Sequence, residues 1–407
     1  MALFSTPLAI LTRRGATRAV CCRIQIIRAL KTNGSRYTTH LPPKVPMHIE
    51  TTNGFTEKKT ALADNDEYVR DIKQAVGSTY GGNYSLKWME KPHNVLILKK
   101  PNDVKSETAL IEIATWLHST YPDLNIIVEP EVADTFKEKL PFVYVVPHDQ
   151  KSEYSRTIDL AITLGGDGTI LHLSSLFPHS TPPIISFSLG TLGFLIPFHF
   201  SQYKTALSEI LRGKMSLLMR MRLTCSLHQP NGARIWRDGK EIGSIQVMNE
   251  VNLHRGRHPS LTSIDCYVNG EYLTEAVADG LIVATPTGST AYSLSAGGPI
   301  VHPSVQSLLL TPICPRSLSF RTVLLPPDVS IQLKIGESSR STAEVSFDGR
   351  EVYTLNKGEY LEVRMSNYPI PCVNRVDVGV DFVRFINDLL KWNQNFENKL
   401  LRHGVLE

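Results

Sequence analysis

The chain has 407 residues, a formal net charge of +4 and 42% hydrophobic residues. This length favours two domains, and the composition is typical of a globular protein with a substantial core. The best uncharged candidate for a membrane span, 181–200, contains three prolines and two glycines, so we expect no membrane-spanning helix and no stable membrane insertion.

The positive charge is concentrated at the amino terminus. Residues 1–49 contain no Asp or Glu but eight Lys or Arg residues, accompanied by Ser and Thr. Arginines at 14, 18, 23 and 28 suit a basic amphipathic helix, which predicts a mitochondrial presequence at 1–45 and a location in the mitochondrial matrix. A disordered basic tail is the alternative. The remaining chain has 35 basic and 39 acidic residues, so no nucleic-acid partner is expected.

The six cysteines include no Cys-x-x-Cys pair, and two of them lie in the expected presequence. This spacing favours neither a zinc site nor a disulfide framework, so no metal ligands are assigned in the protein. A reducing compartment such as the matrix is consistent with this pattern.

The predicted elements fall into two halves. A polar flexible linker is expected at 46–91. Strands then alternate with helices, which predicts a parallel sheet with helices on its faces; strands are expected at 94–98, 124–128, 142–146, 159–164 and 183–187, and helices at 107–118 and 201–211. From residue 216 onward, alternating strands separated by Asn-Gly, Asp-Gly and Lys-Gly turns predict an antiparallel β-domain, and 380–401 returns to helical spacing.

The most informative motif is Gly165-Gly166-Asp167-Gly168-Thr169, which lies between a β-branched apolar run and a helical segment. Glycines here allow backbone N–H groups to approach an anion closely, and the positive end of the following helix points at the same place. A carboxylate is otherwise unfavourable beside an anion, so Asp167 is expected to handle a proton, a hydroxyl or a metal ion. The alternative is an ordinary turn with a capping aspartate.

Four further segments have side chains suited to a nucleotide, although each alone is also typical of packing or surface loops. They are Gly190–Leu195 with Phe194, Asn249-Glu250, Asp279-Gly280 with the Ser/Thr/Gly-rich block 285–299, and Ser346–Arg350. Asn and Glu offer acceptors for a base and for hydroxyls, and small hydroxyl residues can approach ribose and phosphate. The chain has neither a P-loop nor a protein-kinase signature, and the glycine loop lacks the last glycine of the dinucleotide fingerprint.

Taken together, these segments resemble the ATP-NAD kinase family, in the family's order and over roughly residues 92–395. With the amino-terminal extension, the chain is most similar to the fungal mitochondrial NADH kinases. The glycine loop is shared with lipid kinases, whereas the 285–299 block is more specific.

The resemblance implies an α/β fold with a Rossmann-like domain at 92–200 and a β-rich NAD(H)-binding domain at 201–377. A closing helix at 378–395 would pack back on the first domain. It also implies transfer of the ATP γ-phosphoryl group to the 2′-hydroxyl of the adenosine ribose of NADH or NAD. Mg²⁺ would travel with ATP rather than sit in a cage of protein ligands, and a homodimer or homotetramer is expected, with 312–326 at an interface.

The resemblance also assigns roles to residues. Asp167 would be the catalytic residue, acting on the 2′-hydroxyl as a general base or orienting group. The nucleotide-binding positions would be Gly165, Gly166, Gly168, Thr169, Phe194, Asn249, Glu250, Asp279, Thr290, Ala291, Tyr292, Ser295 and Arg350.

Two departures from the family pattern qualify this assignment. Arg350 matches a position that is often Gln in relatives. Val277 stands where some NAD-specific bacterial members carry Arg, which we interpret as permitting NADH use. The rival functions are a lipid kinase that shares the glycine loop and a dinucleotide-binding sensor without catalysis.

Overall fold

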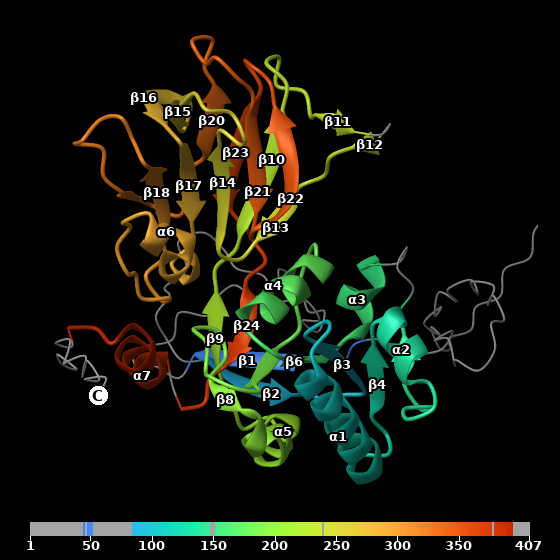
Figure 1. Cartoon of the computed structure of the whole chain (residues 1–407). Coiled ribbons are helices and arrows are strands. Elements are labelled where there is room, and N and C mark those ends of the chain that lie inside the picture. The colour runs from blue at the N-terminus through green and yellow to red at the C-terminus, as the bar shows by residue number, and fades with distance from the viewer. Residues whose placement is uncertain are drawn as a thin grey trace, which may run out of the picture.

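The computed structural model describes residues 44, 47–51, 84–146, 151–237, 240–376 and 378–393. An α/β domain and a β-rich domain lie against each other, the first below and the second above in Figure 1. The predicted fold class is therefore confirmed. The presequence predicted at 1–45 lies outside the described residues except for Lys44. No helix within the described ranges is long and apolar enough to span a bilayer.

A ten-stranded sheet forms the centre of the first domain. Its order is β1-β2-β9-β24-β7-β6-β3-β4-β5, and β8 pairs with β7. The neighbours from β24 through β5 run parallel, as the alternation of strands and helices predicted, while β9, β2 and β1 continue the sheet with antiparallel pairings. The strands are β1 (Met47–Thr51), β2 (Tyr84–Trp88), β3 (Asn94–Lys99), β4 (Asn125–Val128), β5 (Tyr144–Val145), β6 (Leu160–Leu164), β7 (Ile184–Ser188), β8 (Phe198–His199), β9 (Ser216–Arg220) and β24 (Ile370–Val373).

Helices cover both faces of this sheet because its strands are apolar on both sides. In β3, Val95 and Ile97 pack with α1 and α5, whereas Leu96 and Leu98 pack with α3 and α4. The helices are α1 (Val104–Thr120), α2 (Pro130–Phe136), α3 (Lys151–Thr157), α4 (Asp167–Leu176) and α5 (Tyr203–Leu211). Helix α4 lies on the face toward the β-rich domain, so the glycine loop that precedes it faces the domain junction (Figure 1).

The second domain is a sandwich of two six-stranded antiparallel sheets, whose inner faces share one core. The first sheet, in the order β13-β10-β23-β20-β15-β16, contains β13 (Ile245–Val247), β10 (Leu223–His228), β23 (Tyr360–Met365), β20 (Ile331–Ile335), β15 (Thr262–Val268) and β16 (Glu271–Ala278). The second, in the order β19-β18-β17-β14-β21-β22, contains β19 (Val323–Leu325), β18 (Leu308–Ile313), β17 (Gly280–Ala284), β14 (Glu250–His254), β21 (Ala343–Phe347) and β22 (Arg350–Leu355). A small ribbon, β11 (Trp236–Arg237) and β12 (Lys240–Glu241), lies apart.

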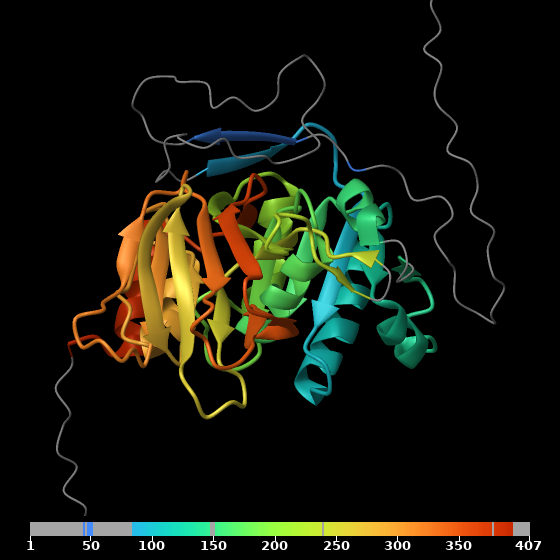
Figure 2. The ribbon, with the colours of Figure 1, turned by 90° about the horizontal axis from the view of Figure 1, so that it is seen from above.

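The observed domain limits differ from the expected ones. The alternating run 217–227 is two strands: β9 joins the first sheet and β10 joins the sandwich. The first domain thus continues through α5 to Arg220, beyond the expected limit at 200, and β24 returns to it at 370–373. Part of the expected linker at 46–91 also differs, because β1 and β2 pair with each other and extend the sheet along its edge (Figure 2).

The closing helix is α7 (Val378–Leu390). It lies at the domain junction and contacts more than the first domain alone, since the ring of Phe382 meets that of His302, from the second half of the chain, edge-on at 4.4 Å. The carboxylate of Asp381, in the first turn, accepts the N–H groups of Arg375 (2.8 Å) and Val376 (3.3 Å), which ties the residues before this helix to its start.

Candidate active site

The glycine loop connects β6 to α4. Gly165 has φ 153°, and a Cβ there would come within 2.5 Å of the hydroxyl of Thr169, so this position requires glycine. A Cβ at Gly166 or Gly168 would meet no other atom within 4 Å. The outer surface of the loop is therefore open, and it adjoins the positive end of α4. This geometry suits the close approach of a phosphate group.

Asp167 is the first residue of α4, and its carboxylate turns toward the 190–195 segment. The backbone N–H groups of Phe194 and Leu195 donate to it at 3.3 and 3.2 Å. A Cβ on Gly193 would overlap this carboxylate, so glycine is required for the approach. Burial raises the pKa of Asp167, while the two amide donors and the nearby Arg220 cation oppose that rise. These backbone groups fix the carboxylate in place, and no basic side chain of the described residues is hydrogen-bonded to it.

Asn249 and Glu250 form a buried pair at the start of β14, each 8% exposed. Within the described part of the chain, Asn249 Oδ1 and Glu250 Oε2 have no hydrogen-bond partner, which leaves two acceptors for a ligand. Burial, and secondarily the charge of Asp348, raises the pKa of Glu250 to about 7, and the N–H of Tyr292 opposes this rise. The pair is therefore suited to accept hydrogen bonds from hydroxyls and a base.

The Ser/Thr/Gly-rich block follows β17 and wraps around this pair. It consists of a 3₁₀ turn (Thr287–Thr290) and a short helix, α6 (Tyr292–Ser295). The hydroxyl of Thr285 donates to the carbonyl of Met248 at 2.6 Å and accepts from the N–H of Gly288 at 3.0 Å. A Cβ on Gly288 would overlap the backbone of Asn249, so the block packs directly on the strand that carries the acceptor pair.

The other predicted residues of the second domain surround this block in different ways. Tyr292 lies beside Glu250, and its side chain is partly exposed. The hydroxyl of Thr290 donates to the carbonyl of Thr287 at 3.1 Å. Ala291 directly precedes α6, and Ser295, the last residue of this helix, is exposed to solvent. Asp279 is already paired with a cation, because Arg255 Nε lies 2.6 Å from its carboxylate. Asp279 can accept a further bond only with its remaining lone pairs.

Arg350 begins β22, yet its side chain reaches the first domain. It donates to the carbonyl of Gly168 and to His172 Nδ1, both at 3.0 Å. The predicted residues Asp167, Gly168 and Arg350 are thus brought together from positions far apart in the sequence.

Comparison with known proteins decides the family. Residues 95–215 match the model of the ATP-NAD kinase N-terminal domain, and residues 248–375 match that of the ATP-NAD kinase C-terminal domain. The chain belongs to the ATP-NAD kinase family. It is therefore an enzyme of the NAD(H) kinase class, and the lipid-kinase and sensor alternatives are set aside.

Individual relatives of this ATP-NAD kinase cover most of its length. "NADH kinase pos5, mitochondrial" of Schizosaccharomyces pombe is 44% identical, covering 78% of this chain and 81% of the relative. "NADH kinase POS5, mitochondrial" of Saccharomyces cerevisiae is 39% identical, covering 77% of this chain and 83% of the relative. The crystal structure of yeast NADH kinase complexed with NADH has a TM-score of 0.70 and 40% identity, covering 78% of this chain and 92% of that one. An NAD kinase structure from Archaeoglobus fulgidus, 20% identical with a TM-score of 0.53, shares the fold.

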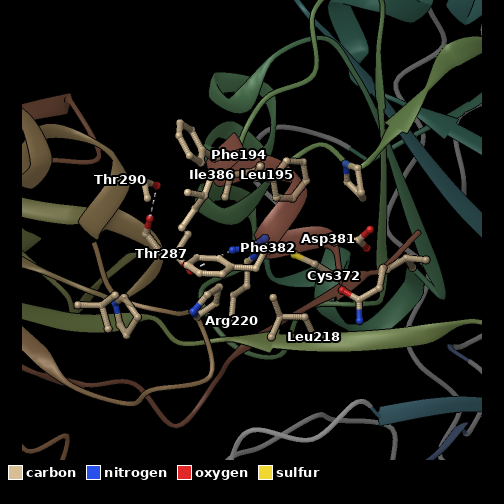
Figure 3. A pocket seen from close by; sticks show the side chains of 17 residues that line it. Phe194, Leu195, Leu218, Arg220, Thr287, Thr290, Cys372, Asp381, Phe382 and Ile386 are labelled. Atoms are coloured by element: carbon tan, nitrogen blue, oxygen red, sulfur yellow. Dashed lines mark hydrogen bonds between the residues drawn. The ribbon is translucent and has the colours of Figure 1, made fainter. Parts of the chain in front are cut away.

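A pocket at the domain junction of this kinase contains one residue that the sequence pattern did not reveal (Figure 3). Arg220, at the end of β9, is 8% exposed and donates to the hydroxyl of Thr287 at 3.3 Å. Its Nε has no partner in the described part of the chain. Phe194 and Thr290, both predicted ligand residues, line the same pocket, together with Phe382 of α7. The only feature of the sequence that could have indicated Arg220 is its positive charge at the end of the largely apolar strand β9.

Among the described residues, no cluster of three or more His, Cys, Asp or Glu side chains could hold a metal ion. The four described cysteines are free thiols.

Proposed function

We propose that this chain transfers the γ-phosphoryl group of ATP to the 2′-hydroxyl of the adenosine ribose of NADH or NAD. The observation that carries the proposal is the placement of the Asp167 carboxylate, which is fixed by two backbone amides at the start of α4 and lies beside an open glycine loop. Phosphoryl transfer depends on in-line positioning and charge stabilisation rather than on covalent help from the protein.

In this proposal the two domains hold different parts of the reaction. The glycine loop and the positive end of α4 bind phosphates of ATP, which arrives with its own Mg²⁺. Asn249 Oδ1 and Glu250 Oε2 accept hydrogen bonds from the base and ribose hydroxyls of the dinucleotide. Asp167 orients the 2′-hydroxyl and takes its proton late in the transfer, because a ribose hydroxyl is too weak an acid to ionise beforehand.

The test is to incubate purified protein with ATP·Mg²⁺ and either NADH or NAD, and to assign the product by ³¹P NMR. A 2′-phosphomonoester on the adenosine ribose supports the proposal. Phosphate at another hydroxyl, or no product with either acceptor, would contradict it.

We further propose that NADH is an acceptor of this enzyme. Two similar proteins are named as NADH kinases, and a similar structure was solved with NADH. In this chain Val277, two residues before Asp279, leaves that position of β16 without a cation. The measurement is kcat/KM for NADH and for NAD, and a strong preference for NAD would remove this support.

The proposed location is the mitochondrion, specifically the matrix. The acid-free, arginine-rich residues 1–49 and the mitochondrial relatives support it. A fluorescent fusion of the full chain is expected to enter mitochondria, and a fusion lacking residues 1–45 is expected to remain outside.

A homodimer or homotetramer is also proposed. The 312–326 segment presents Leu318, Val323 and Leu324 with 86%, 42% and 46% of their surfaces exposed, and a second copy of the chain could cover these apolar side chains. Light scattering on the purified protein distinguishes the oligomer from a monomer.

A further inference from the structure

A tight turn between β21 and β22 lies where the two domains meet. Phe347 pairs with Arg350 across it, and the intervening Asp348 and Gly349 have φ of 48° and 69°. Two successive residues in the left-handed region are typical of the two-residue hairpin turn whose backbone is tightly constrained. The backbone positions of Asp348 and Arg350 are therefore fixed relative to each other.

Asp348 binds the second domain's half of the site. Its carboxylate accepts the backbone N–H groups of Met248 (2.8 Å), Asn249 (2.7 Å) and Glu250 (3.2 Å). These three bonds fix the backbone that carries the two unpartnered acceptors. Charged hydrogen bonds of this kind are stronger than neutral ones.

Arg350 binds the first domain's half. It donates to the carbonyl of Gly168, next to Asp167, and to His172 Nδ1, one helical turn further along α4. Because Nδ1 accepts this bond, the proton of the neutral ring is on Nε2, which lies 2.7 Å from the Glu129 carboxylate and donates to it. Glu129 immediately precedes α2, so the chain of bonds from Arg350 ends on a second helix of the first domain.

The position of Arg350 is electrostatically unusual. A cation beside the positive end of a helix is unfavourable unless negative charge offsets it. Glu129 supplies that charge through His172, so protein groups orient the guanidinium although Arg350 is exposed to solvent.

We propose that the 347–350 turn is an interdomain clasp that sets the phosphate-binding loop in register with the dinucleotide-binding pair, and that His172 and Glu129 are positioning residues for it. This inference rests on the proposed function, because it assigns the two half-sites to the two substrates. The glycine loop belongs to the first domain, and the Asn249 and Glu250 acceptors belong to the second. Loss of the clasp therefore misaligns the reacting groups while each nucleotide still finds its own contacts.

The test compares kcat with KM in His172→Phe, Arg350→Gln and the double variant. We expect kcat to fall about 10- to 100-fold in each, since misplacement of about 1 Å costs that much. KM for ATP and for the dinucleotide should stay within about threefold of wild type. The double variant should be no slower than the slower single variant, because both substitutions break one connected unit.

Two matched variants serve as controls. His172→Asn keeps an acceptor near the Nδ1 position and should recover most of the lost turnover. Arg364→Gln removes an exposed guanidinium that pairs with Glu362 within the β-rich domain, and this variant should behave as wild type. Thermal melting confirms that each variant is folded.

Two outcomes overturn the inference. If His172→Phe retains wild-type kcat while Arg350→Gln raises only KM for ATP, then Arg350 is a phosphate ligand and no clasp exists. If the losses of the single variants multiply in the double variant, the two residues act independently. Failure of the proposed function is distinct, because wild-type protein would then form no 2′-phosphorylated product at all.

Discussion

Asp167 experiences opposing influences from its surroundings. Burial favours the neutral acid, whereas the N–H groups of Leu195 and Phe194, together with the Arg220 cation, favour the carboxylate. In the proposed reaction, a group in this balance can take up a proton during the transfer and release it afterwards. Its two backbone donors hold the side chain in place without neutralising it, so geometry and charge are set by different neighbours.

Asp167→Asn tests this assignment directly. The amide keeps the size of the side chain and can still accept from one backbone N–H, but it cannot take a proton. We expect nucleotide affinity to stay near wild type and turnover to fall by about 10²–10⁴-fold. Calorimetric titration measures the affinity and steady-state assay the turnover. Unchanged turnover would contradict the role of this residue.

Burial of Glu250 favours ligand binding but lowers the stability of the folded protein at neutral pH. Its pKa is about 7 in the folded protein, raised from an ordinary value of 4.5 by burial. Below pH 4.5 both folded and unfolded states carry the neutral acid. As the pH rises from 4.5 to 7, ionisation favours the unfolded state, so the folded protein loses stability over this window.

Glu250→Gln should abolish that loss. The free energy of unfolding of the ligand-free variant should exceed that of wild type by up to about 3 kcal/mol at pH 8 and by almost nothing at pH 4. Dinucleotide affinity should fall, because the carboxylate acceptor is gone. Urea unfolding at both pH values measures the difference. An equal difference at the two pH values would show that ionisation of Glu250 is not its cause.

The segment 190–195 acts as a unit that holds the Asp167 side chain, the proposed catalytic group. Two of its backbone N–H groups bind Asp167, and Gly193 provides the space for the carboxylate to lie against the segment. Gly190, three residues earlier in the same loop, has no atom near its own Cβ position. A side chain at Gly193 would therefore collide with Asp167, whereas a side chain at Gly190 would not.

Gly193→Ala should displace the Asp167 carboxylate and lower kcat by about 10²-fold, since misplacement of about 1 Å has a cost of that size. Gly190→Ala, the matched control, adds the same methyl group to the same loop and should leave kcat near wild type. Parallel assays of the two variants measure this contrast. Equal losses would show that the loop responds to any added side chain.

Much of the element order was predictable because it depends on local pattern. The β-branched run before Gly165 and the helical spacing after Asp167 correctly indicated β6 and α4. The strands β1 and β2 were missed because each is a five-residue run at one end of a mostly polar stretch, and they join the sheet only by pairing with each other and with β9. The split of 217–227 was missed as well, because two strands of one alternating run belong to different sheets.

For the candidate site, glycines, acids and hydroxyl residues in short motifs predicted the loop and the acceptor pair as ligand-binding groups, and their roles stay predictions. The contact between His172 and Arg350 could not be anticipated, because 178 residues separate them. Arg220 could not be placed either, since its partner Thr287 is 67 residues away and the pocket around it is formed by both domains.

The arrangement of the two domains depends on two segments where the chain passes from one domain to the other. One lies between β9 and β10, and the other between β23 and β24. Arg222, fully buried at the first crossing, accepts the N–H of Ser366 with its carbonyl and donates from Nε to the carbonyl of Tyr368, both at the second. The two crossings are therefore tied to each other by one residue.

The same guanidinium also holds α4 from its far end. It donates to the carbonyls of Phe177 and His179 at 2.9 and 2.6 Å, just beyond the last turn of the helix. A cation there satisfies carbonyls that the helix leaves unpaired and offsets its negative end. Burial lowers the pKa of Arg222 to about 9, which still leaves it charged at neutral pH. The helix that presents Asp167 at its start is thus anchored at its end to both crossings.

Arg222→Met should destabilise the protein by about 3–5 kcal/mol, because it leaves several buried carbonyls without donors while keeping most of the side-chain volume. Arg364→Met, a partly exposed arginine paired with Glu362, should change the free energy of unfolding by less than about 0.5 kcal/mol. Equilibrium urea unfolding of both variants measures the difference. If Arg222→Met unfolds at the wild-type urea midpoint, other contacts hold the domains together. The hydrogen bonds that connect α4 to the crossings would then contribute nothing measurable to the free energy of unfolding.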